Sequence, residues 1–280
     1  MSSDVLSTER SLSQTERHDA IAELVLGDGS VRIDDLTRRL NVSRMTIHRD
    51  LDALEARGIL RKSRGTVTAV ASSLFEASTE YRARQNTPEK EAIASLAAGL
   101  VSAGEAIILD DSTTGLRLAK HLTEREPLTV ITNFGRVLKL LEGHAGITLL
   151  STGGEYFRLC DAYSGALALR SLEMLSADTY FMSSPAVMNG MCYHPHQELV
   201  LVKQAMFRAA RRRVLIVDHT KFTRTALHAM MPVKDFDVVI VDSNVDPEHL
   251  RMLRQSGVDV QVAHVSETQG KLQHHGDEKP

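Results

Sequence analysis

The stretch VRIDDLTRRLNVSRMTIHRDLDALEARGILRKSRG, residues 31–65, decides the fold of the amino-terminal part of this chain. Apolar residues recur at helical spacing in it and just before it. The three predicted helices are Glu16–Leu26, Ile33–Leu40 and Arg44–Arg57. Ser43 stands where its hydroxyl can cap the third helix. The two segments that flank a basic turn are Ile59–Leu60 and Val67–Val70. Three short helices followed by a two-stranded wing predict a winged helix-turn-helix domain.

The charge of this stretch is opposite in sign to that of the whole chain. The 280 residues carry a formal net charge of −3 at pH 7, whereas eight basic residues face three acidic ones between Arg38 and Arg64, a local net charge of +5. Basic side chains and small hydroxyls at the start of a third helix suit phosphate and base-edge contacts. The candidate DNA-contacting residues are Ser43, Arg44, Thr46, His48, Arg49, Arg61, Lys62 and Arg64. A small helical subdomain with solvated arginines is the alternative, and His48 fits a solvent-facing position as well as a base contact.

The stretch resembles the DNA-binding domain of the DeoR family of bacterial transcriptional regulators. That family typically shows a V-S-x-x-T-I-R-R-D-L core, followed by a glycine, an arginine and a His-Gly-Gly wing. The matching residues are Val42, Ser43, Thr46, Ile47, Arg49, Asp50, Leu51, Gly58, Arg61 and Gly65. His48 replaces the first of the paired arginines, which leaves the operator sequence open. Arg64 and Thr66 replace the histidine and second glycine of the wing, which keeps its positive charge.

From Glu89 onward, helical and strand patterns alternate. The predicted helices are Lys90–Ser102, Gly115–Thr123, Phe134–Glu142, Gly165–Leu175, Glu198–Arg211 and Glu248–Gln255. The predicted strands are Ala106–Asp110, Leu128–Thr132, Ile147–Thr152, Thr179–Met182, Val214–Asp218, Val238–Asp242 and Val258–Val262. Several of these strands are short apolar runs, which is typical of strands buried on both faces. The alternation therefore predicts an α/β domain with a mainly parallel sheet, whose ligand lies beyond the carboxyl ends of the strands.

Pattern and composition divide the chain into five segments. They are a flexible arm (1–15), a winged helix-turn-helix DNA-binding domain (16–70), a linker (71–88), an α/β effector-binding sensor domain (89–266) and a disordered tail (267–280). Within the linker we expect a helical turn near Phe75–Ala83. The longest apolar runs span four residues, far short of the roughly 18 that a membrane helix needs. The start lacks the apolar stretch of a signal peptide, and two cysteines cannot form a disulfide framework. We expect a cytoplasmic protein with no membrane partner.

Polar residues and glycines follow several predicted strands. A buried strand leads at Asp110 into a hydroxyl-rich turn and a helix, whose first N–H groups can hold a phosphate or carboxylate. An ordinary turn with a capped helix explains that turn equally well. Lys221, which follows a later strand, can neutralise a sugar phosphate. The candidate effector-binding residues are Asp110, Ser112, Thr113, Thr114, Thr132, Asn133, Gly153, Gly154, Asp218 and Lys221.

The resemblance to the DeoR family extends over about residues 15–265. Sensor domains of that family are similar to ribose-5-phosphate isomerase, with Rossmann-like layers, and usually bind phosphorylated sugars. Their pattern L-D-x-G-[ST]-T, T-N, G-G and D-x-x-K matches Leu109, Asp110, Thr113, Thr114, Thr132, Asn133, Gly153, Gly154, Asp218 and Lys221. Ser112 replaces a glycine of this pattern. Ser183 and Ala186 replace the glycines of an F-x-G-x-x-G-I loop, which Pro185 stiffens, so the ligand can be larger, differently phosphorylated or more apolar.

The resemblance implies a transcriptional regulator of carbohydrate metabolism, most often a repressor, that a sugar phosphate releases from its operator. Repeated half-sites in operators imply a homo-oligomer, a dimer or a tetramer. No cofactor, catalytic residue or metal is expected. The alternatives are a sugar-phosphate isomerase or hydrolase fused to a DNA-binding module, with Asp110 and Asp218 as candidate bases, and an architectural protein whose α/β domain only oligomerises. We interpret 192–196 (CYHPH) as a loop rather than a zinc site, and Arg211–Arg213 as the end of a helix.

Overall fold

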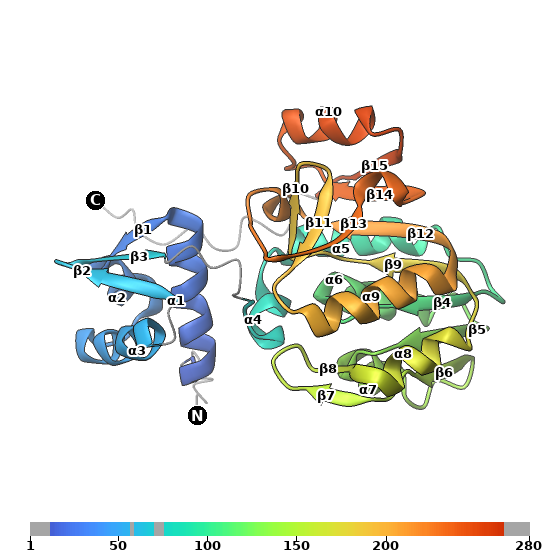
Figure 1. Cartoon of the computed structure of the whole chain (residues 1–280), viewed down its shortest axis with the longest axis horizontal. Helices are drawn as coiled ribbons and strands as arrows, with labels where there is room; N and C mark the ends of the chain where they lie inside the picture. Colours follow the sequence, from blue (N-terminus) through green and yellow to red (C-terminus); the bar gives the residue numbers. More distant parts are fainter. Residues whose placement is uncertain (1–11, 57–58, 70–75, 266–280) are drawn as a thin grey trace, which may run out of the picture. The chain divides into compact units, whose positions relative to one another are not determined.

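The computed structural model describes residues 12–56, 59–69 and 76–265. The chain divides into two compact units, Met1–Ser72 and Ser73–Pro280, whose elements are labelled in Figure 1. Several parts named above lie outside the described residues: most of the amino-terminal arm, the tail after residue 265, Arg57, Gly58, and 70–75. No helix within the described parts of the chain has the length and apolar character needed to cross a membrane.

The first unit has the predicted winged helix-turn-helix fold. Its elements are α1 (Gln14–Asp28), β1 (Ser30–Arg32), α2 (Ile33–Leu40), α3 (Arg44–Ala56), β2 (Leu60–Ser63) and β3 (Thr66–Ala69). The helices bury one apolar core, to which Ile21, Leu36, Ile47 and Leu51 contribute fully buried side chains. The wing has three strands rather than two, in the order β1-β3-β2, because the short strand β1 pairs with β3.

The second unit is built on seven parallel strands, as the alternating pattern predicts. They are β4 (Ala106–Leu109), β5 (Leu128–Thr132), β6 (Ile147–Ser151), β9 (Ala177–Met182), β12 (Ala210–Val217), β14 (Val238–Asp242) and β15 (Asp259–Ala263). The strand order is β15-β14-β12-β9-β4-β5-β6. The chain order reverses between β4 and β9, and ligands of open α/β sheets bind at the carboxyl ends beside such a reversal.

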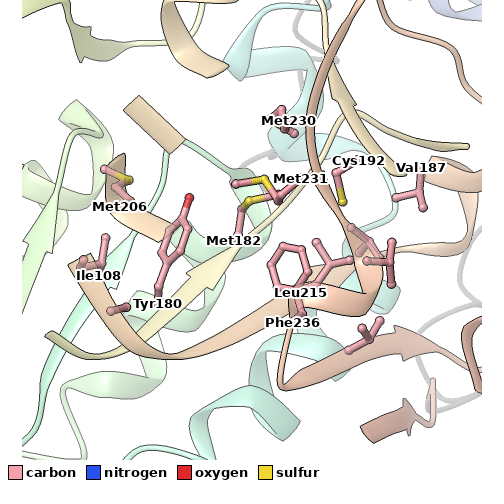
Figure 2. Packing of buried hydrophobic residues seen from close by; sticks show 14 of the residues in the cluster. Ile108, Tyr180, Met182, Val187, Cys192, Met206, Leu215, Met230, Met231 and Phe236 are labelled. Atoms are coloured by element: carbon pink, nitrogen blue, oxygen red, sulfur yellow. The ribbon is translucent and has the colours of Figure 1, made fainter. Parts of the chain in front are cut away.

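Helices cover both faces of this sheet, because alternate side chains of each strand point to opposite faces. The helices are α5 (Thr87–Ala98), α6 (Thr113–Leu122), α7 (Gly135–Leu141), α8 (Gly165–Glu173), α9 (Gln197–Ala209) and α10 (Pro247–Gln255). On one face Ile107 and Phe181 pack with residues of α5, α6 and α7. On the other face Ile108 and Tyr180 pack with residues of α8, α9 and α10; Figure 2 shows part of this second cluster.

Several short elements of the second unit are absent from the sequence-based prediction. They are β7 (Glu155–Phe157), β8 (Ala162–Ser164), β10 (Ala186–Met188), β11 (Met191–His194), β13 (His228–Pro232), and the 3-10 turns η1 (His219–Phe222) and η2 (Val233–Asp235). Helix α4 (Thr79–Arg84) overlaps the helical turn predicted near Phe75–Ala83. Strands β10, β11 and β13 form an antiparallel sheet of their own. Cys192 and His194 therefore lie in a strand and not in a loop. Arg211–Arg213 lie in β12, directly after its first residue, and do not end a helix.

The predicted linker 71–88 is wrong from residue 76 onward. Residues 76–88 contain α4 and the start of α5, and Glu76, Ser78 and Thr79 are buried in the α/β unit. Ser78 caps α4 by accepting a hydrogen bond from the Tyr81 backbone N–H at 3.4 Å. The composition concealed this packing because the buried groups are polar and find their partners in distant parts of the chain.

Candidate nucleic-acid interface and effector site

Helix α3 presents a polar exposed face and is held in place by its buried one. Arg44, His48 and Arg49 are exposed at its start, whereas Asp50 is buried. Arg17 of α1 donates to Asp50 at 2.5 Å (Nε to Oδ2) and 3.0 Å (Nη2 to Oδ1). A carboxylate paired in this way fixes the orientation of α3 relative to α1, since a charge-assisted bidentate contact is directional.

Ser43 and Thr46, both predicted to contact DNA, form hydrogen bonds within the start of α3. Ser43 Oγ accepts a hydrogen bond from the Thr46 backbone N–H at 3.2 Å and lies 2.9 Å from Thr46 Oγ1. This is the capping arrangement expected for a serine directly before a helix.

The wing carries two exposed arginines and one compensated lysine. Arg61 and Arg64 are exposed, and the turn between β2 and β3 uses Gly65 at φ +72°, which favours glycine. Lys62 forms ion pairs with Asp52 and, at 3.5 Å, with Glu55. Its hydrogen bond to Asp52 raises the pKa of Lys62. The sequence placed Lys62 with the DNA contacts, but its charge is already offset by two carboxylates.

Beyond β4 the structure has a group of buried charges, here called the strand-end cluster. Its members are Glu76, Asp110, Asp111, His194 and Lys203, which are buried, and Arg82, whose side chain is 14% exposed. Lys203 Nζ of α9 lies 2.6 Å from Asp110 Oδ2 and 2.8 Å from Asp111 Oδ1. Burial opposes ionisation of Asp111, yet the charge of Lys203 lowers its pKa to about 2. At Asp110 burial prevails and raises the pKa.

Asp110 connects two loops at the reversal of the chain order. Its Oδ1 accepts a hydrogen bond from the Ser112 backbone N–H at 3.1 Å, and its Oδ2 accepts one from the Ser183 backbone N–H at 2.9 Å. Ser112 and Ser183 follow β4 and β9 respectively. Because Asp110 is fully buried and both oxygens are engaged, it fixes the shape of the site.

The other half of the strand-end cluster ties α4 to β11. Glu76 forms an ion pair with Arg82 at 3.1 Å (Oε1 to Nη1), and its Oε2 lies 3.4 Å from His194 Nε2. Burial lowers the pKa of His194 to about 4. The Cys160 thiol donates to Glu76 Oε2 at 3.4 Å. The sequence analysis did not identify Glu76, Arg82, His194 or Lys203 as site residues.

Asp218 and Lys221 meet the start of α5 beyond β12. Asp218 Oδ1 accepts hydrogen bonds at 3.1 Å from both the Asn86 side-chain amide and the Thr220 backbone N–H. Lys221 Nζ lies 3.7 Å from Asp218 Oδ2. Lys90 Nζ donates to the Arg82 carbonyl at 2.5 Å. Burial lowers the pKa of Lys90 to about 7, and the neighbouring charge of Lys221 acts in the same direction.

The hydroxyl-rich turn at residues 112–114 also contacts residues 82–90. Thr113 Oγ1 lies 3.5 Å from the Arg82 carbonyl, which also accepts from Lys90. Thr113 and Thr114 are both buried at the start of α6. The structure therefore links the predicted residues after β4 to those after β12 through residues 82–90.

The predicted residues after β5 and β6 have other partners. Thr132 Oγ1 accepts from the Phe134 backbone N–H at 3.1 Å, and the Asn133 side-chain amide donates to the Tyr163 carbonyl at 3.1 Å. Gly153 and Gly154 have φ +60° and +112°. A Cβ on Gly154 would lie 2.3 Å from the Ser164 carbonyl oxygen. The close approach that Gly154 permits is therefore to the chain itself.

Comparisons with known proteins agree with this organisation. Residues 17–73 match the DeoR-like helix-turn-helix domain, and residues 85–243 match the DeoR C terminal sensor domain. The chain is 35% identical over 248 residues to the HTH-type transcriptional regulator YgbI of Escherichia coli (strain K12), covering 89% of this chain and 97% of that protein. It is 31% identical to the lactose phosphotransferase system repressor of Lactococcus lactis subsp. lactis, with coverage of 87% and 97%.

A solved structure of ribose 5-phosphate isomerase A from Methanocaldococcus jannaschii is also similar, with a TM-score of 0.38, 17% identity, and coverage of 49% of this chain and 55% of that one. The family matches span both units of the chain, and their members are regulators rather than enzymes, so the enzyme alternative is not supported. Because both its helix-turn-helix domain and its sensor domain match family models, the chain belongs to the DeoR family of DNA-binding transcriptional regulators.

Proposed function

We propose that this regulator is a repressor of carbohydrate-metabolism genes that leaves its operator when a phosphorylated sugar binds beyond β4 and β12. The observation that carries the proposal is the set of contacts from residues 82–90 to both strand ends. The sugar follows from the relative in Lactococcus lactis, whose name is that of a repressor of a lactose phosphotransferase system. The regulator acts in the cytoplasm, where its two buried cysteines stay free.

The proposed site has an excess of positive charge that an anionic ligand would offset. The charge of Lys221 lowers the pKa of Lys90, and the charges of both lysines lower the pKa of Asp218 against the effect of its burial. Lys90 is buried, so its ammonium group is costly to keep charged unless a counter-charge is present. The sugar's phosphate supplies that counter-charge, and the Thr113 and Thr114 hydroxyls at the start of α6 add donors.

The sugar itself extends toward β5 and β6 in this proposal. Asn133 Oδ1 is buried and has no hydrogen-bond partner among the described residues, so it can accept from a ligand hydroxyl. Thr132 and the backbone at Gly153 lie at the neighbouring strand ends. Asp110 and Ser112 hold the turn in shape beside the ligand.

Residues 76–86 provide the route by which the ligand affects DNA binding. They follow directly in sequence on the segment that joins the two units, and Asn86 is bonded to Asp218 and, at 3.2 Å, to Thr220 Oγ1. A ligand that moves Lys221 or Asp218 therefore acts on α4 through Asn86 and Arg82. Release requires different affinities of the ligand for two states, with a coupling of about 1–3 kcal/mol. Operators with repeated half-sites require a dimer or a tetramer.

Mobility shifts on DNA upstream of neighbouring genes, with and without a panel of pentose and hexose phosphates, test the proposal. We expect one duplex to be bound in preference to random competitor and one sugar phosphate to release it. Lys221→Ala should bind that duplex normally but fail to release it, whereas Lys139→Ala, a change of an exposed lysine, should behave as wild type. Release of Lys221→Ala at the wild-type ligand concentration would show that the ligand site is misplaced.

A further inference from the structure

Met45 is an exposed apolar side chain in the middle of the basic face of α3. It is 73% exposed, and the other large apolar side chains that are exposed among the described residues all belong to the α/β unit. Residues 45, 48 and 49 share one side of a helix, since positions i, i+3 and i+4 are neighbours. Met45 therefore lies on the same face as His48 and Arg49, opposite the buried Ile47 and Leu51.

The position of Met45 directs it to base edges rather than to phosphates. In a helix-turn-helix, the first residues of the second helix of the motif enter the major groove. Met45 is the second residue of that helix, α3. Its neighbours Ser43 and Thr46 are already bonded to each other at the helix start, so they do not take its place at the base edges.

The chemistry of methionine limits what Met45 can recognise there. Its side chain has no hydrogen-bond donor and only a weak acceptor. The one apolar group that the major groove presents is the C5 methyl of thymine. We propose that Met45 determines sequence specificity by packing against a thymine methyl in the operator. This inference rests on DNA binding by the family and not on the proposed ligand or its site.

The test starts from a duplex that the full-length protein selects from a random library. Each dT of that duplex is then replaced by dU, which removes only the methyl group. We expect one dT→dU position to weaken wild-type binding about fourfold, the value for one buried methyl group. Met45→Ala should bind the parent duplex more weakly and be insensitive to dU at that position. At the same position dC should bind poorly and 5-methyl-dC should bind better than dC.

Two further variants keep the test decisive. Met45→Leu keeps an apolar side chain and should retain part of the sensitivity to dU, whereas Met174→Ala removes a methionine that is 85% exposed in the α/β unit and should change nothing. Equal responses of wild type and Met45→Ala to every dU replacement would overturn the inference while leaving the regulator function intact. Failure to select any duplex would instead overturn DNA reading itself, and Met45 with it.

Discussion

Replacing Lys203 by methionine should destabilise the α/β unit by about 3–5 kcal/mol, the usual cost of removing one partner from a buried ion pair. Methionine keeps most of the apolar length of the side chain and removes only the cation. The cost for a buried pair applies because Lys203 and Asp111 are each 2% exposed and Asp110 is 0% exposed, so solvent does not replace the ammonium group. The two carboxylates that Lys203 contacts at 2.6 and 2.8 Å would then lose their direct counter-ion, and of the cluster's cations only the more weakly acting Arg82 would remain.

Thermal unfolding of the full-length protein measures this effect. For a unit of this size, about 3–5 kcal/mol lowers the Tm by roughly 6–20 °C. The matched control is Lys139→Met, because Lys139 is exposed and pairs only with its helical neighbour Glu142 among the described residues. Adding Asp111→Asn to Lys203→Met should recover part of the loss, since it removes one of the two opposed charges.

The pH dependence gives an independent check on the same variant. Without Lys203 the carboxyl pKa values in the folded state rise above those of the unfolded chain. The folded state then binds more protons between these values, so acidification from pH 7 to 5 should narrow the stability difference between Lys203→Met and wild type. A Tm loss of less than about 2 °C, or a gap that widens on acidification, would refute the view that Lys203 neutralises the cluster.

Other expectations concern single residues. Arg49→Ala should reduce the slope of log affinity against log salt by about one if Arg49 contacts a phosphate, and an unchanged slope would exclude that contact. Lys62→Ala should weaken DNA binding less than Arg61→Ala in the same titration, because Lys62 already forms ion pairs with Asp52 and Glu55. Burial lowers the pKa of His194 from 6.5 to about 4, so the unfolded chain binds more protons between these pH values and stability falls by up to about 3 kcal/mol as the pH drops through them. Urea unfolding at several pH values should show that His194→Gln loses most of this dependence, and an equal dependence would contradict it. Asn86→Ala should leave operator affinity unchanged in a mobility shift but raise the ligand concentration needed for release; unchanged release would remove Asn86 from the route.

The parts of the fold that the sequence predicts are those with a strong local period. Helix α2 covers Ile33–Leu40 and strand β5 covers Leu128–Thr132, both with the predicted bounds. Each has an apolar pattern that its own residues complete. Strand β13 was missed because it is short and pairs with β11, far away in the sequence, which leaves no local period to detect. Strands β10 and β11 do have a local signal: they form a hairpin across Asn189 and Gly190, which both have positive φ, and Asn-Gly favours such a turn.

The candidate site could be predicted only in part, because several of its residues find their partners far away in the sequence. Residues next to strand ends could be found by position, but Lys203 looked like an ordinary helical lysine. A signal did exist: Leu199, Val200 and Met206 are buried on α9, and Lys203 shares their helical spacing. A lysine within an apolar stripe needs a buried partner, since an isolated buried charge is not stable. Asp110 and Asp111 are the carboxylates that Lys203 contacts in the structure.

Ser112, which replaces a glycine of the family pattern, changes the proposed anion site in a specific way. Its φ of −90° is open to any residue, so the backbone does not require glycine at this position. Ser112 Oγ accepts from the Gly115 backbone N–H at 2.9 Å, and a Cβ on residue 115 would lie 2.8 Å from that oxygen. The cap and the glycine at 115 therefore depend on each other. The cap also occupies one of the N–H groups at the start of α6 that could otherwise bind an anion. An anionic ligand must rely correspondingly more on Lys90 and Lys221, which is why their charge, rather than the helix start, should decide its affinity.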